Sequence, residues 1–272
     1  MKTTDKSFGA LLSLLQDDDA KVASLAMEQF LKLGDVSAAL ARFQEDGDSR
    51  VRHRIHQIGS IVIRRKARQA FIDNVRSGQP DLWQGVCQIN GLYDPQSSMD
   101  KVNRSVRELA SELPGIHVKA ADIAALMKEK EFFVPEEDML DGELYMVDSV
   151  LETRYGSAIA LCVLAFRLGE LRDWKADPVL FEGRLCLLEK DGVLLDPANK
   201  WKVHALEESD KLHKCAKKDV WFMFLSQLFL IALVEGQLRD LYHFGDLLTA
   251  LNEGTIDDLP APLGIGKEVI QA

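Results

Sequence analysis

The feature that most constrains this chain is a change in the pattern of apolar residues after residue 169, from helical spacing to short strand-like segments. Before that point apolar residues recur at helical spacing, and an apolar helix is predicted over Ala158–Leu168. The residues that follow form short segments rich in valine and leucine, and Asp191-Gly192 between two of them is a hairpin signal. The segments are Pro178–Phe181, Arg184–Glu189, Val193–Asp196 and Lys202–Ala205. The pattern predicts a small antiparallel sheet among helices, and therefore an α+β fold that is predominantly helical.

Two helices are predicted to close the ordered part of the chain, at Val220–Val234 and Leu238–Leu251. The first contains 15 residues without a charge. Because a membrane-spanning helix needs roughly 20 apolar residues, we expect this segment to be a helix buried in a soluble core, and we expect no membrane partner.

Before residue 79 the apolar spacing predicts helical hairpins. Asp19-Ala-Lys21-Val22 is echoed 29 residues later by Asp48-Ser-Arg50-Val51, so an acidic turn precedes a helix twice. The echo resembles HEAT-like helical repeats. Two units are few for a free-standing solenoid, so we expect them to pack on the domain that follows. Gly78-Gln-Pro80 marks the boundary, which gives a first domain at 1–78, a second at 79–253 and an irregular tail at 254–272.

The composition indicates a soluble globular protein, with 47% hydrophobic and 28% charged residues. The net charge of −10 argues against a nucleic acid as partner, because affinity for a phosphate backbone comes from clustered lysine and arginine. The first residues contain no apolar signal segment, which favours a cytoplasmic location. The four cysteines lack metal-ligand spacing, so we predict buried free thiols, no metal and no cofactor.

One region runs against the overall charge and is basic. Its cations are Arg50, Arg52, Arg54, Arg64, Arg65, Lys66 and Arg68, and His53 and His56 lie among them. Such a region could bind an anionic partner, such as a phosphate, an RNA or an acidic protein face. We favour the simpler interpretation, in which it is the solvated outer face of a repeat helix.

A second pattern lies just before the sheet and continues into it. Between residues 138 and 161 it consists of Asp138, Asp141, Val150, Leu151, Glu152, Arg154, Gly156 and Leu161. Glu182-Gly183-Arg184-Leu185 and Leu195-Asp196-Pro197-Ala198 follow. In order and spacing, these residues resemble the bacterial SirB-type branch of the transglutaminase-like superfamily, over Leu82–Trp201. The resemblance implies a papain-like core around the small sheet.

The resemblance also implies a site built from a cysteine at a helix start, a histidine on the next strand and an aspartate on the strand after it. At these positions the chain has Ala158, Arg184 and Asp196. Alanine supplies no nucleophile, and arginine stays protonated, so it cannot act as a base. The sequence therefore predicts a vestigial site, with Arg184 and Asp196 in a partly buried ion pair. It also predicts a non-catalytic protein that binds or scaffolds a protein partner.

The alternative hypothesis is a thiol or serine hydrolase or transferase with a relocated nucleophile. Cys162 lies one helical turn beyond Ala158, and Cys186 lies on the same strand face as Arg184. Ser157 could act through its hydroxyl group. Against this, a free cysteine is usually a buried small hydrophobe, and a serine before a helix usually caps it.

Overall fold

The computed structural model describes residues 2–33, 48–115, 117–136, 140–207, 211–252 and 254. The chain divides into two compact units, Met1–Ala67 and Arg68–Ala272. The division falls inside one long helix, α4 (Ser49–Arg76), whereas the sequence placed a domain boundary at residue 78. Apart from Gly254, the predicted tail 254–272 lies outside the described residues, as does Asp138 of the second pattern.

The N-terminal unit is helical. Helices α1 (Lys2–Leu14) and α2 (Ala20–Lys32) pack with the first part of α4. Their shared core consists of Leu15, Ala26, Phe30, Val51, Ile55, Ile58 and Val62. The rings of Phe8 and Phe30 meet edge to face, with their centroids 5.1 Å apart. Apolar residues three and four apart on each helix therefore meet in one small core.

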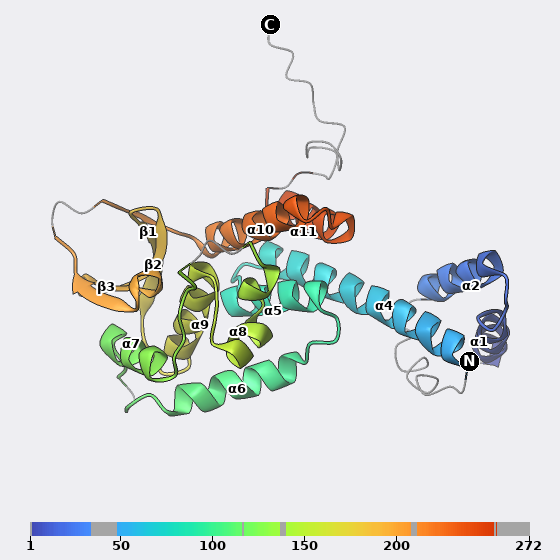
Figure 1. Cartoon of the computed structure of the whole chain (residues 1–272), viewed down its shortest axis with the longest axis horizontal. Coiled ribbons are helices and arrows are strands. Elements are labelled where there is room, and N and C mark those ends of the chain that lie inside the picture. Colours follow the sequence, from blue (N-terminus) through green and yellow to red (C-terminus); the bar gives the residue numbers. More distant parts are fainter. Residues whose placement is uncertain are drawn as a thin grey trace, which may run out of the picture. The chain divides into compact units, whose positions relative to one another are not determined.

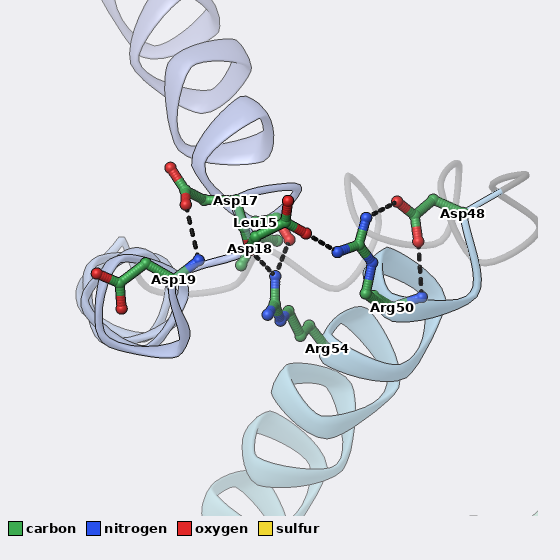
Figure 2. Close-up of polar contacts among 7 residues, drawn as sticks. All are labelled: Leu15, Asp17, Asp18, Asp19, Asp48, Arg50 and Arg54. Carbon is green, nitrogen blue, oxygen red and sulfur yellow. Dashed lines mark hydrogen bonds and ion pairs between the residues drawn. The ribbon is translucent and has the colours of Figure 1, made fainter.

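The two similar acidic segments, at Asp19 and Asp48, form equivalent helix caps in this unit. Asp19 accepts a hydrogen bond of 2.8 Å from the Lys21 amide at the start of α2. Asp48 accepts one of 2.8 Å from the Arg50 amide at the start of α4 (Figure 2). Arg50 also pairs with Asp18 and, at 3.3 Å, with Asp48. A carboxylate that binds the free amides of a first helical turn stabilises the helix start.

The cations of the basic region are exposed or half-buried, as a solvated face would be, and two of its arginines also bond to segments at the ends of α1 and α2. Arg54 donates to the carbonyls of Leu15 and Asp17, just beyond α1 (Figure 2). Arg65 donates to the Leu31 carbonyl near the end of α2. These guanidinium groups bind carbonyls in the last turn of α2 and just beyond α1, where the helix supplies no further amide partner.

The larger unit contains a five-stranded antiparallel sheet in the order β4-β3-β2-β1-β5. The strands are β1 (Ala176–Phe181), β2 (Arg184–Glu189), β3 (Val193–Asp196), β4 (Lys202–Ala205) and β5 (Leu212–Lys214). The hairpin expected at Asp191-Gly192 joins β2 to β3, and Gly192 adopts a left-handed φ of 85°. The four predicted segments are therefore confirmed as strands, and β5 is an addition that the sequence did not indicate.

The helices of this unit lie mostly to one side of the sheet and make the fold predominantly helical (Figure 1). They are α5 (Leu82–Tyr93), α6 (Met99–Ser111), α7 (Ala120–Glu129), α8 (Val147–Thr153), α9 (Ala158–Glu170), α10 (Lys217–Val234) and α11 (Leu238–Leu251). Two short 3₁₀ helices complete the unit: η2 (Gly142–Tyr145) precedes α8, and η3 (Pro197–Asn199) lies between β3 and β4. Helix α9 contacts β2, η3 and helices α5, α6, α7, α8 and α10, so the start of α9 is held firmly against the sheet.

Three local contacts fix this arrangement. The buried Glu189 carboxylate on β2 accepts hydrogen bonds from the Ala120 amide, at 2.8 Å, and from the Trp174 indole. The Trp174 ring packs so closely on Gly169 that a Cβ atom there would lie 2.2 Å from it. The Asn74 side chain exchanges two hydrogen bonds of 2.9 Å with the backbone of Asp81, which clamps the turn between α4 and α5.

Helix α10 differs from its sequence prediction. One face is buried, through Val220, Trp221, Phe224, Leu225, Leu228, Ile231 and Ala232. The opposite face exposes Phe222, Leu230, Leu233 and Val234. The expectation of a helix buried in a core is therefore met on one face only, because α9, α5, η2 and α11 contact this helix and cover one side of it. No helix in the described ranges is long and apolar enough to cross a membrane.

Candidate functional site

The start of α9 is built by backbone contacts from three segments. Ser157 is the N-cap, and its Oγ accepts a hydrogen bond of 3.1 Å from the Ala160 amide. The Ser157 amide donates to the Leu144 carbonyl at 2.7 Å, and the Gly156 amide donates to the Phe133 carbonyl at 3.2 Å. The half-buried Ala158 is the first residue of the helix. The position implied for a nucleophile therefore has a helix N-terminus behind it and presents only a methyl group.

Arg184 and Asp196, the residues that the resemblance groups with Ala158, lie on β2 and β3. Leu187 pairs with Leu195 and Leu188 with Leu194, so the same register places Cys186 opposite Asp196. Arg184 lies two residues before Cys186, on the same face of the sheet. Its Nε lies 3.2 Å from Oδ2 of Asp196. The ion pair predicted from the sequence is therefore confirmed.

The two members of the pair differ in exposure, with 39% of the Arg184 side chain and 1% of the Asp196 side chain accessible to solvent. Asp196 also accepts a hydrogen bond of 3.2 Å from the Asn199 amide. Arg184 binds a second carboxylate, that of Glu182, at 2.9 Å. Burial opposes the charge of Arg184, but the nearby Asp196 and Glu182 carboxylates outweigh it and raise the pKa of its guanidinium. The group at the position implied for a histidine therefore holds its proton firmly.

Glu182 is a site residue that sequence reasoning missed. It lies in the turn between β1 and β2, where Glu182 has φ of 48° and Gly183 has φ of 78°. Two residues with positive φ form the tight hairpin turn that matches strand twist. Gly183 was the signal in the sequence that could have indicated this turn. A tight turn at Glu182-Gly183 would have placed the Glu182 side chain close to Arg184.

The alternative nucleophiles are placed where they react poorly. Burial raises the pKa of the Cys186 thiol to about 12, and the neighbouring Asp196 carboxylate adds to this effect while Arg184 opposes it. Burial also raises the pKa of the Cys162 thiol well above its usual value. A thiol attacks as a thiolate, so both groups are held in the unreactive form at neutral pH. Ser157 uses its hydroxyl as a cap and bonds with the Tyr145 phenol.

Three residues of the second pattern make contacts that shape the local backbone. Asp141 caps η2 by accepting a hydrogen bond of 2.9 Å from the Glu143 amide. Arg154 ends α8 with a left-handed φ of 70°, and its guanidinium lies 4.7 Å from the centre of the Phe132 ring. Gly156 lies against Leu161 and Val150 so closely that a Cβ atom would be 3.1 Å from each. The pattern therefore specifies how the chain enters α9.

One of the comparisons with known proteins gives a family for this part of the chain. Residues 94–222 match the family model of the transglutaminase-like superfamily. This segment is a transglutaminase-like domain. It includes the start of α9 and the Arg184–Asp196 pair, and it ends in α10, beyond the Trp201 limit expected from the sequence. Comparison of the chain with curated proteins and with solved structures found no match.

Proposed function

We propose that the transglutaminase-like domain is non-catalytic and that the protein binds or scaffolds a protein partner. The observation that carries the proposal is the ion pair between Arg184 and the buried Asp196, together with Ala158 at the start of α9. A thiol enzyme of this architecture needs a cysteine at the helix start and an imidazole that accepts and returns a proton. Neither chemical group is present at the corresponding positions of this chain.

The Arg184–Asp196 pair preserves the architecture of the site without its chemistry. In a catalytic triad the aspartate orients the imidazole and stabilises its charge. Here the same kind of carboxylate accepts a hydrogen bond from a guanidinium that holds its proton. The contact supports a role for Arg184 and Asp196 in holding β2 against β3 and η3, so that the surface of the domain stays intact for binding.

Finer assignments form part of the same proposal. The order and spacing of the second pattern support the SirB-type branch, which is bacterial, and the paired Asp19 and Asp48 caps support a HEAT-like origin for the N-terminal unit. A cytoplasmic location and a protein partner rather than a nucleic acid are supported by the free cysteines and the net charge of −10. Within the described ranges, no three histidine, cysteine or carboxylate side chains are grouped as metal ligands.

The test is an assay of the full chain with glutamine-containing peptides and with small amide and ester substrates. We expect no turnover above background. A second arm uses the double variant Ala158→Cys/Arg184→His, with Ala158→Cys alone as its matched control. If the site is a vestige of the triad, the double variant gains a thiol that reacts with iodoacetamide faster than the thiol of the single variant, because an imidazole lowers the pKa of the introduced cysteine.

The competing hypothesis predicts a different outcome. A hydrolase or transferase with a relocated nucleophile would turn over one of these substrates as the unaltered chain. Its activity would disappear in one of three variants, Cys162→Ala, Cys186→Ala or Ser157→Ala. Such a result would refute the non-catalytic proposal, and native labelling of a single cysteine would identify the nucleophile.

A further inference from the structure

A pocket between α6 and α8 lies outside the residues of the vestigial site. It encloses about 640 Å³, which falls within the range of roughly 300–1,000 Å³ that is typical of ligand sites. One wall is a face of α6, from its N-cap Ser98 to its C-cap Glu112. The other wall belongs to α8 and includes Leu151, Glu152 and Arg154, which are all residues of the second pattern. We name this feature the α6–α8 pocket.

The two helices run in the same direction along the α6–α8 pocket. Lys130 pairs with Glu112 at the C-terminal end of α6, and it also experiences the charge of Arg154 at the C-terminal end of α8. Asp148, near the start of α8, lines a second pocket together with Asp94, which precedes α6. The α6–α8 pocket is therefore about as long as α6, or roughly 20 Å at 1.5 Å per residue, which is the length of an extended chain of about six residues.

One end of the α6–α8 pocket presents two cations. The half-buried Arg154 has its guanidinium 4.7 Å from the centre of the Phe132 ring, and contact with a ring occupies none of the five N–H donors of that group. Glu112 and Glu129 pair with Lys130, at 2.5 and 3.9 Å. Within the described ranges, no carboxylate is bonded to Arg154. Arg154 is therefore the cation that can bind the carboxylate of a ligand through two parallel hydrogen bonds.

The rest of the lining limits the kind of ligand. Val102 and Leu109, which are buried residues of α6, line the α6–α8 pocket together with the half-buried Leu151. Two exposed carboxylates, Glu108 and Glu152, line it as well. A ligand with many negative charges would be repelled by these carboxylates, which excludes a nucleic acid. A peptide with one carboxylate and apolar side chains is complementary to both the cation and the apolar part of the lining.

We propose that the α6–α8 pocket binds an extended peptide segment of a protein partner, with a carboxylate of the peptide on Arg154 and apolar side chains over Leu109 and Leu151. The carboxylate belongs to the C-terminus of the peptide or to an acidic side chain, because a guanidinium binds both in the same way. This inference rests on the proposed binding of a protein partner and names the segment that the partner presents. Turnover by the unaltered chain would refute the non-catalytic role without affecting this pocket, and a lack of peptide binding would refute the pocket alone.

The first experiment measures binding of the fluorescently labelled full chain to an array of hexapeptides attached through their N-termini. The array is made twice, with free and with amidated C-termini. We expect binding to peptides in which a carboxylate lies next to apolar residues. Loss of binding on amidation would support the proposal and assign the carboxylate to the C-terminus, and amidated peptides that bind only with an aspartate or glutamate would support it and assign the carboxylate to a side chain. Binding that needs no carboxylate, or no binding to either array, would overturn the proposal.

The second experiment uses variants of the full chain to place the bound peptide in the α6–α8 pocket. Arg154→Gln should weaken binding by about 10- to 100-fold, because the carboxylate loses its charged hydrogen-bond donors. The matched control is Arg107→Gln, which changes an exposed arginine of α6 outside the lining and should leave binding unchanged. Ser105→Tyr should abolish binding by filling the middle of the pocket while leaving Arg154 in place, whereas Ser111→Tyr, outside the lining on the same helix, should not. Circular dichroism confirms that each variant folds, and binding unchanged by Arg154→Gln or by Ser105→Tyr would overturn the proposal.

Discussion

Replacing Arg184 with methionine tests how far the ion pair stabilises the larger unit. The Arg184→Met variant keeps the length of the side chain but leaves the Asp196 carboxylate buried without its cation. Removing one partner of a fully buried pair costs about 3–5 kcal/mol, and an exposed pair contributes about 0–1 kcal/mol. Because Arg184 is 39% exposed and Asp196 only 1%, we expect an intermediate loss of roughly 2–3 kcal/mol in the free energy of unfolding.

Urea unfolding followed by tryptophan fluorescence measures this loss in the full chain. The four tryptophans, at 83, 174, 201 and 221, all lie in the larger unit, so the signal reports on that unit. The matched control is Lys214→Met, which breaks an exposed pair with Asp177 in the same sheet and should cost less than about 1 kcal/mol.

A double variant separates two causes of the loss in stability: the uncompensated Asp196 carboxylate and the lost contact with Arg184. If the uncompensated carboxylate causes the loss, Arg184→Met/Asp196→Leu should recover most of it, because apolar groups of similar size can replace a buried pair. An Arg184→Met variant as stable as the Lys214→Met control would refute the reasoning, since it would mean that Asp196 gains nothing from its partner.

Three more outcomes follow from the structure. The pKa of Cys186 is about 12 in the folded protein, against the usual 9.0. The contribution of this thiol to the free energy of unfolding is therefore fully present below pH 9 and falls as pH rises toward 12, by about 1.4 kcal/mol per pH unit. Cys186→Ala should make the decline of the unfolding free energy at alkaline pH less steep. Gly169→Ala should cost about 1–3 kcal/mol in thermal or urea unfolding, because its methyl group collides with the Trp174 ring, and an unchanged midpoint would contradict that packing. Asn74→Ala should cost about 2 kcal/mol through the two hydrogen bonds lost to Asp81, whereas Asn74→Asp, which keeps the acceptor, should cost less in the same assay.

Local signals in the sequence were sufficient to predict the elements around the site. The alternation of apolar segments and the Asp191-Gly192 turn indicated four of the strands, and the helix beginning at Ala158 is present as expected. The Arg184–Asp196 contact could be predicted because it depends only on two adjacent strands joined by a tight hairpin. A contact across a tight hairpin can be predicted because the turn residues fix which residues of the two strands face each other.

Features that depend on distant parts of the chain could not be predicted in this way. Strand β5 has three residues and no apolar alternation, and it exists because β1 offers an edge for pairing. Helix α4 continues as far as Arg76, although the sequence suggested only short hairpins before residue 78. The exposure of α10 depends on which neighbours pack against it, and its uniform apolar composition gave no sign of a free face.

The carboxylate of Glu189 couples two elements that are distant in the sequence. Because it binds the first amide of α7, that helix start is fully protected only while β2 is in place. In native-state hydrogen exchange, the Ala120 amide should therefore exchange with the amides of β2 as one cooperative unit, more slowly than amides at the frayed starts of other helices. The sheet and the beginning of α7 should therefore open and close together in the native state.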